Sequence, residues 1–148
     1  MEERLRLEAE KQEKVNKFRI LNQYVKTGAT LFVGSSLMEG FPINELLMDY
    51  GMPQVIYNRG IGGFTIPELY SVRDICIFDL KPERIFINIG TNDIAAPGYT
   101  LEKLIENYRT LLRQIQERLP ETSVYMMAYY PVNETDHFDV EIEWQKHL

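Results

Sequence analysis

The 148-residue sequence contains a single cysteine, only two histidines and no long apolar run. Because Cys76 has no partner in the chain, no intrachain disulfide can form, and nothing here requires an oxidising compartment. Cys76 lies among apolar neighbours and is expected to be a buried apolar side chain. No segment approaches the roughly 20 apolar residues of a membrane span, and the charged start lacks the features of a signal peptide. These absences predict a cytoplasmic location.

An excess of positive charge is also missing. The chain has 16 Lys and Arg against 22 Asp and Glu, a formal net charge of -6. Because nucleic acids and anionic lipids are bound through clustered basic residues, this balance argues against both as partners. The content of 45% hydrophobic and 26% charged residues is typical of globular proteins. We therefore expect a single domain over residues 1–148 that binds neither nucleic acid nor membranes.

Short apolar segments alternate with helical patterns along the chain. The predicted strands are residues 30–33, 55–57, 84–89 and 123–128. The predicted helices are residues 2 to about 26, 42–51, 67–80 and 100–119. This alternation predicts a three-layer α/β/α fold with a parallel sheet in flavodoxin-like order. Because the chain stops shortly after its fourth strand, we expect the last strand and helix of such a sheet to be missing.

Polar loops follow the first three predicted strands. They read Gly-Ser-Ser-Leu at residues 34–37, Asn-Arg-Gly-Ile-Gly-Gly at residues 58–63 and Gly-Thr-Asn-Asp at residues 90–93. Parallel strands end at the same edge of a sheet, and ligands bind in the crevice there. A hydroxyl, a bare backbone amide and a side-chain amide can therefore meet at one point. Those groups suit attack on an acyl carbonyl and binding of the resulting oxyanion.

Each loop also has a purely structural interpretation. Ser36 could cap the helix that follows, and the glycines of residues 60–63 could serve only a tight turn. Asn92 and Asp93 could be turn residues that bond their own backbone. Three such explanations together require a coincidence of order and placement, so we favour a catalytic role for Ser36 and Asn92. We assign Asp93 a structural role.

The three loops resemble the sequence blocks of the SGNH, or GDSL-type, hydrolases, and the second is most similar to the platelet-activating-factor acetylhydrolase branch. The resemblance implies that Ser36 is the nucleophile and that the Gly63 amide and the Asn92 side chain bind the oxyanion. It implies a serine esterase or acylhydrolase that cleaves a small acyl ester through an acyl-serine intermediate. No cofactor is required, and the sequence offers no persuasive metal site.

Two positions depart from the pattern of that family. Ser35 stands where the family usually carries Asp. The fourth block, an Asp-x-x-His that supplies the acid and base, is absent, because Glu134 and Trp144 precede His137 and His147 by three residues. We expect the acid and base to lie beyond the last residue, with His137 as a minor alternative for the base.

A chain without its acid and base retains only the modest acceleration due to binding and the oxyanion hole. The alternative function is therefore a catalytically impaired ligand-binding or scaffold module of the same fold. A homodimer formed through the amino-terminal helix or the edge of the fourth strand is a further possibility.

Overall fold

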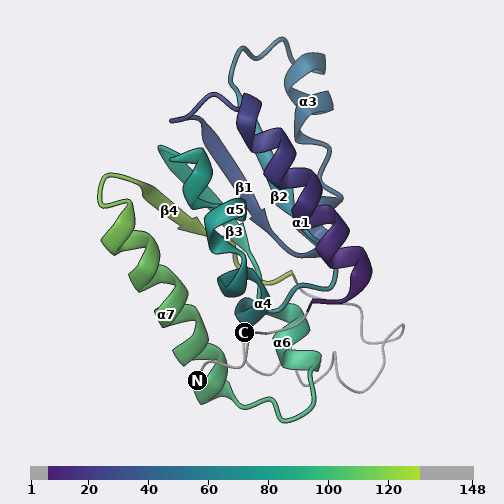
Figure 1. Cartoon of the computed structure of the whole chain (residues 1–148), viewed down its shortest axis with the longest axis vertical. Helices are drawn as coiled ribbons and strands as arrows, with labels where there is room; N and C mark the ends of the chain where they lie inside the picture. Colours follow the sequence, from purple (N-terminus) through teal and green to yellow (C-terminus); the bar gives the residue numbers. More distant parts are fainter. Residues whose placement is uncertain (1–6, 131–148) are drawn as a thin grey trace.

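The structure, a computed structural model, describes residues 7–130 and contains one four-stranded parallel sheet. The strands are β1 (Thr30–Gly34), β2 (Ile56–Gly60), β3 (Arg84–Asn88) and β4 (Ser123–Met126). Their order across the sheet is β2-β1-β3-β4, as in a flavodoxin-like fold (Figure 1). The predicted fold class is confirmed, and all four strands lie where the sequence predicts them to within a few residues.

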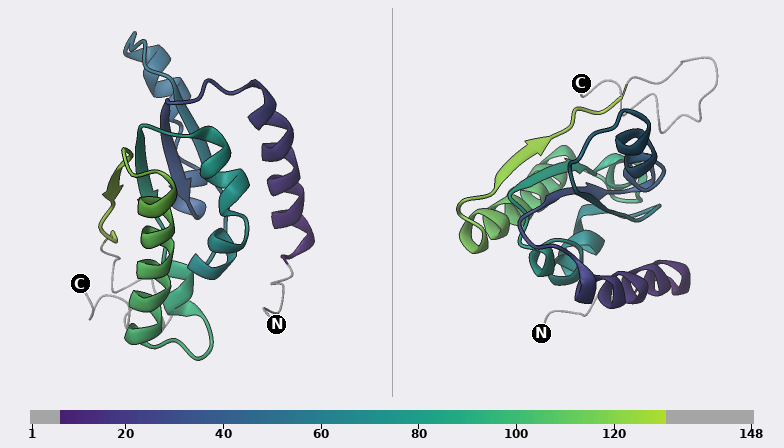
Figure 2. Two further views of the ribbon diagram at one scale, coloured as in Figure 1. Left: turned by 60° about the vertical axis from the view of Figure 1, so that its left-hand side comes forward. Right: turned by 90° about the horizontal axis from the view of Figure 1, so that it is seen from above.

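Helices cover both faces of this sheet (Figure 2). The face that carries the main hydrophobic core packs against α1 (Ala9–Leu21), α4 (Ile66–Ser71), α5 (Arg73–Cys76) and α7 (Leu101–Arg118). The short helices α2 (Ser36–Glu39) and α3 (Ile43–Asp49) contact the other face, mainly at β2. A further short helix, α6 (Thr91–Ala95), follows β3. This layering places the loops after β1, β2 and β3 at one edge.

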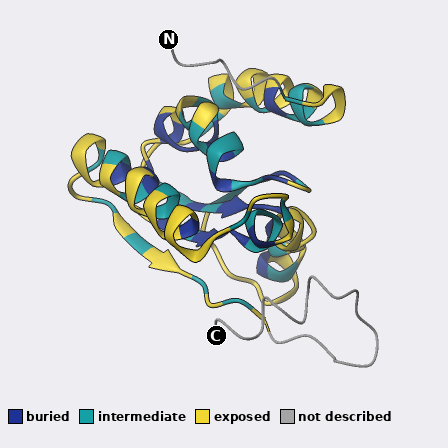
Figure 3. Cartoon of the chain, turned by 90° about the horizontal axis from the view of Figure 1, so that it is seen from below, coloured by how far each residue is buried: buried dark blue, intermediate teal, exposed yellow. Residues whose placement is uncertain are grey.

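The side chains of the central strands β1 and β3 alternate between the two faces of the sheet, and both faces are packed. Leu31 and Val33 of β1 are fully buried, as are the corresponding residues of β3, and they face the main core. On the opposite face Phe32 contacts Phe86 of β3, with ring centroids 5.2 Å apart. Figure 3 shows the burial concentrated in these strands, whereas the edge strand β4 is largely exposed. The two central strands therefore form a fixed platform for the loops at their carboxyl ends.

The amino-terminal helix is shorter than predicted. Residues 7 and 8 are not helical, α1 ends at Leu21, and a 3-10 turn, η1 (Asn22–Tyr24), follows. Residues 2–6 of the predicted helix lie outside the described residues. Val15 is fully buried, but Tyr24 is 80% exposed. Because the 3-10 turn changes the angular spacing between residues, the predicted apolar stripe does not continue through Tyr24.

The helix predicted for residues 67–80 is wrong as a single element. It is divided into α4, α5 and a 3-10 turn, η2 (Phe78–Leu80), with non-helical backbone at Val72 and Ile77. Residues 76–78 are all buried. One straight helix cannot turn three successive side chains toward the same surface, so the chain changes direction to bury them. The prediction of a buried Cys76 is confirmed, and burial raises the pKa of its thiol to about 12.

The longest helix, α7, is the best predicted one. Thr100 precedes it and accepts a hydrogen bond from the Lys103 amide at 3.2 Å, as a helix cap does. Leu111 and Ile115 pack into the core, whereas Ile105 is 42% exposed. The buried stripe is thus narrower than the apolar spacing predicts. Across residues 7–130, every helix is too short or too polar to traverse a bilayer.

Candidate active site

The three polar loops meet at the carboxyl edge of the sheet. Gly34 at the end of β1 lies in register with both Gly60 of β2 and Asn88 of β3. The Ser35 amide donates to the Asn88 carbonyl oxygen at 3.1 Å, and the Ile61 amide donates to the Gly34 carbonyl oxygen at 3.0 Å. The first loop is therefore hydrogen bonded to the chain on either side of it. This is the convergence that the parallel sheet predicts.

Ser36 is the first residue of α2 and is exposed, whereas the neighbouring Ser35 is buried. The helix α2 lies directly against β2, where a Cβ atom on Gly60 would come within 2.3 Å of the Glu39 nitrogen. The Asn58 side chain fixes this contact, because its Nδ2 donates to the Met38 carbonyl oxygen at 2.6 Å and its Oδ1 accepts from the Gly60 amide at 2.9 Å. A glycine and an asparagine of the second loop thus set the position of the helix that carries Ser36.

The glycine pair of the second loop lies beside Ser36. A Cβ atom at residue 62 would lie 3.9 Å from the Cβ of Ser36. The Gly62 amide donates to Oε2 of Glu39 at 2.8 Å, and the Gly63 carbonyl oxygen accepts from Nζ of Lys11 at 3.1 Å. Gly63 has a φ of +74°, which favours glycine. Gly63 is an exposed residue, and within the described part of the chain its amide donates to no other residue, so this N–H is available to a ligand.

The third loop is tied to the second. Nδ2 of Asn92 donates to the Phe64 carbonyl oxygen at 2.9 Å. A side-chain amide carries two N–H groups, so one remains for a ligand. Gly63 and Asn92 both line a cavity of about 560 Å³, within the range of small-molecule sites, although Ser36 is not among its lining residues. The two residues that carry the candidate oxyanion donors therefore border one space that can hold part of a substrate.

Asp93 has a structural role, but it holds a distant segment, whereas the sequence predicts a turn residue that bonds its own backbone. Its two carboxylate oxygens accept from the Ile66 amide at 3.1 and 3.0 Å and so hold the first residue of α4. Burial raises the pKa of Asp93 to about 6, although the hydrogen bond from Ile66 acts in the opposite direction. Among residues 7–130 no group of three or more His, Cys, Asp or Glu side chains is placed to hold a metal ion.

Sequence reasoning missed the side chains that support these loops. Glu39 lies one helical turn after Ser36, a spacing that could have indicated a shared helix face. Lys11 and Lys14, which bond Gly63 and Glu39, give no local signal because they belong to a distant helix. His137, the minor alternative for the base, lies outside the described residues, and the catalytic roles of Ser36, Gly63 and Asn92 stay predictions.

Comparison with known proteins points in one direction. A family model described as GDSL-like lipase/acylhydrolase matches residues 32–147. A protein from Streptococcus pneumonia, described as a candidate platelet activating factor, has a similar structure with a TM-score of 0.76 and 27% identity. That match covers 93% of this chain and 67% of the other. A search of curated proteins found no significant match.

More distant structures share the fold. A GDSL-like lipase from Bacteroides thetaiotaomicron VPI-5482 has a TM-score of 0.66 at 18% identity, over 89% of this chain and 68% of that one. A variant of an acetyl-xylooligosaccharide esterase from Geobacillus Stearmophilus has a TM-score of 0.62 at 19% identity, over 83% and 70%. Similarity at this level of identity concerns the fold alone. The chain spans about two thirds of the length of these three proteins.

Proposed function

Because the chain belongs to the GDSL-like lipase/acylhydrolase family, we propose that it carries the nucleophile and the oxyanion-binding groups of a serine esterase. In this proposal Ser36 is the nucleophile, and the Gly63 amide and the Asn92 side chain bind the oxyanion. The substrate is a small acyl ester, as the sequence resemblance implies. The cytoplasmic location and the possible homodimer stay predictions.

The chemistry proceeds in two steps. Oγ of Ser36 forms a bond to the acyl carbon, the carbonyl oxygen becomes an oxyanion, and the bond to the alcohol oxygen then breaks. Water releases the acyl group from Ser36 in the second step. A base must take the Ser36 proton and return it to the leaving alcohol. Residues 7–130 contain no histidine, so the proposal assigns no base within them.

The contact between the first and second loops is the observation that carries this proposal. The Cβ position at residue 62 lies only 3.9 Å from the Ser36 side chain, and the next amide, that of Gly63, is unengaged within the described residues. Asn92 adjoins the same loop through its bond to Phe64. These contacts support the proposal that one hydroxyl and two N–H donors act on a single carbonyl group.

Covalent labelling tests the role of Ser36. We expect a fluorophosphonate probe to add one adduct to the wild-type protein, produced here and in every activity test below with any residues that follow Leu148, because the acid and base are expected there. Intact mass and peptide mapping should locate the adduct at Ser36. Ser36→Ala should abolish the adduct, whereas Ser71→Ala, which removes an exposed serine hydroxyl on α4, should keep it. No adduct on Ser36 in the wild-type chain, or one that persists in Ser36→Ala, would count against the nucleophile.

Steady-state kinetics tests the oxyanion donors. On p-nitrophenyl acetate and longer esters, removal of the Asn92 amide in Asn92→Ala should lower kcat by about 100- to 1000-fold. This is the range observed when one oxyanion donor is lost, corresponding to about 3 to 4 kcal/mol. If Asn92→Ala instead weakens binding of the ground-state ester by the same factor and leaves kcat unchanged, a role of Asn92 in the transition state is contradicted.

A ligand-binding or scaffold module of the same fold is the second candidate. The cavity that Gly63 and Asn92 line without Ser36 favours it. Such a module would bind esters or their hydrolysis products without turnover. Saturable ester binding by calorimetry, together with no acid released and no Ser36 adduct, would select this candidate over the esterase.

A further inference from the structure

Glu39 connects the candidate nucleophile helix to the candidate oxyanion loop. It lies three residues after Ser36 in α2, and its Oε2 accepts the Gly62 amide at 2.8 Å. Its other oxygen, Oε1, is 2.9 Å from Nζ of Lys14 on α1. Both carboxylate oxygens are thus engaged, one by the loop and one by the amino-terminal helix. A carboxylate held in this way acts as an anchor, since its oxygens are already occupied by donors.

The loop that Glu39 holds needs an external anchor. Gly62 and Gly63 have no side chains of their own to fix them, and glycine has the widest range of backbone conformations. The candidate donor is the Gly63 amide, in the peptide group between these two residues. Glu39 holds the peptide group before it through the Gly62 amide, and Lys11 holds the one after it through the Gly63 carbonyl oxygen. The donor peptide is therefore flanked by two fixed points.

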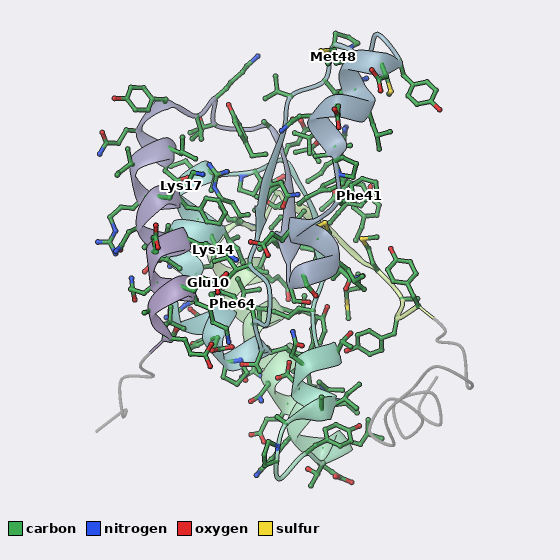
Figure 4. The ribbon with its side chains drawn as sticks, turned by 90° about the vertical axis from the view of Figure 1, so that its right-hand side faces the viewer. Glu10, Lys14, Lys17, Phe41, Met48 and Phe64 are labelled. Atoms are coloured by element: carbon green, nitrogen blue, oxygen red, sulfur yellow. The ribbon has the colours of Figure 1, made fainter. Side chains whose placement is uncertain are left out.

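Helix α1 supplies both cations of this arrangement. Figure 4 views the molecule from the side of this helix and labels Glu10, Lys14 and Lys17 on it. Nζ of Lys11 also bonds the carboxylate of Glu68 at 2.8 Å, so it bridges the glycine loop and α4. The hydrogen bond with Glu39 and, to a smaller extent, the one with Glu10 raise the pKa of Lys14 to about 12. Lys14 therefore stays protonated at neutral pH.

The charge balance of the arrangement matters for an oxyanion site. A lone carboxylate beside the glycine loop would repel the negative charge that develops on the substrate oxygen. Lys14 pairs with Glu39 and offsets that charge, so Glu39 can accept the Gly62 amide at little electrostatic cost to the transition state. Donors fixed in advance are more effective, because no reorganisation is then needed during the reaction.

We propose that Glu39, paired with Lys14, is a positioning residue that holds the Gly62–Gly63 loop so that the Gly63 amide points at the reacting carbonyl. The effect of Glu39 on catalysis rests on the proposed function, whereas its hydrogen bond to the Gly62 amide does not. It gives the amino-terminal helix α1 a part in the active site, through contacts to a loop some 50 residues away in the sequence.

Amide hydrogen exchange tests the anchor without reference to catalysis. In the ¹⁵N-labelled chain we expect Glu39→Ala to speed exchange of the Gly62 amide at least tenfold, because its acceptor is gone. Glu39→Gln keeps an acceptor oxygen and should stay within threefold of wild type. Glu10→Gln is the matched control: Glu10 also pairs with Lys14 at 2.9 Å, but it is 80% exposed and does not touch the loop. Equal Gly62 exchange in Glu39→Ala and Glu10→Gln would overturn the proposal.

Kinetics on a p-nitrophenyl ester tests the catalytic meaning. Glu39→Ala should lower kcat about 10- to 100-fold, less than loss of a donor itself, with KM within threefold. Glu39→Gln should recover most of the loss, and Glu10→Gln should match wild type. A Glu39→Gln variant that is as slow as Glu39→Ala would overturn the role of Glu39 as an acceptor. Where Glu39→Ala fails to fold, a folded Glu39→Gln variant with the same 10- to 100-fold loss of kcat would overturn that role. If the wild type, carrying any residues that follow Leu148, shows no Ser36-dependent turnover, the proposed function fails, and Gly62 exchange alone decides on the anchor.

Discussion

Gly60 offers a direct test of how the active-site edge is packed. A Cβ atom there would lie 2.3 Å from the Glu39 nitrogen and 2.8 Å from both the Glu39 Cα and the Met38 carbonyl carbon. All three atoms belong to the backbone, so no flexible side chain can move aside. Gly60→Ala must therefore push α2 away from β2 by about 1 Å or distort both, and α2 carries Ser36.

The expected cost can be estimated. Overpacking by one methylene in a well-packed core costs about 1 to 3 kcal/mol, and a backbone contact this short belongs at or above the upper end. With an m-value of about 2 kcal/mol/M, a loss of about 3 kcal/mol lowers the urea midpoint by about 1.5 M. Equilibrium unfolding followed by circular dichroism measures this shift. The displaced α2 should also weaken fluorophosphonate labelling of Ser36.

Two other glycines separate steric overlap from backbone strain. Gly28 has a φ of +82° with nothing within 4 Å of its Cβ position, so Gly28→Ala should cost only about 1 kcal/mol. Gly34 combines a φ of +156° with a Cβ position 1.9 Å from the Asn88 carbonyl oxygen, so Gly34→Ala should be at least as damaging as Gly60→Ala. If Gly60→Ala costs no more than Gly28→Ala, the close approach of α2 to β2 is not real and the argument fails.

Substitutions at three further positions test other parts of the fold. The pKa of Asp93 lies above its value in the unfolded chain, so its contribution to the free energy of unfolding is greatest below pH 4 and is lost as the pH rises to about 6. Between pH 4 and pH 6.5 the free energy of unfolding of the wild type should fall by about 1 to 2 kcal/mol relative to that of Asp93→Asn, after a discount for the partial exposure of Asp93. Identical pH profiles of the two proteins would refute this. Thr100→Ala removes the cap of α7 and should cost about 1 kcal/mol by urea denaturation, whereas Thr100→Ser should cost less. Arg59 is buried, and its Nε and Nη2 both donate to Oδ1 of Asn22 at 3.2 and 2.9 Å. Arg59→Lys should therefore cost about 1 to 2 kcal/mol in the same assay, and an unchanged urea midpoint would contradict this account.

The sheet could be predicted from the sequence because its signals are local. Each strand is a short run of β-branched and apolar residues, and each of the first three is followed by a glycine or asparagine loop. A parallel sheet then dictates that those loops share one edge. That rule puts Ser36 and Gly62 at the same edge, and the pairing of β1 with β2 makes them neighbours. Helix α7 could be predicted equally well, since its cap and its apolar spacing lie within one segment.

The elements that the sequence predicts poorly depend on contacts between distant segments. An apolar stretch such as residues 75–78 satisfies a helical pattern, but burial of Cys76, Ile77 and Phe78 together requires a break that only the surrounding core imposes. The end of α1 is set in the same way. Asn22, just after it, bonds the Ile75 carbonyl oxygen and the Arg59 guanidinium, and neither partner is near in sequence.

The same distinction explains why the sequence indicates the chemistry of the site but not its support. A glycine loop is recognisable because the chemistry demands a bare amide, yet the absence of side chains means that the loop cannot fix itself. Its anchors must come from other elements, and here they are Glu39 from α2 and two lysines from α1. Such anchors have no required spacing from the motif, since any cation or carboxylate that reaches the loop will serve. It follows that the supporting residues can differ between proteins that share the same three loops, and that only a structure reveals which side chains perform this task.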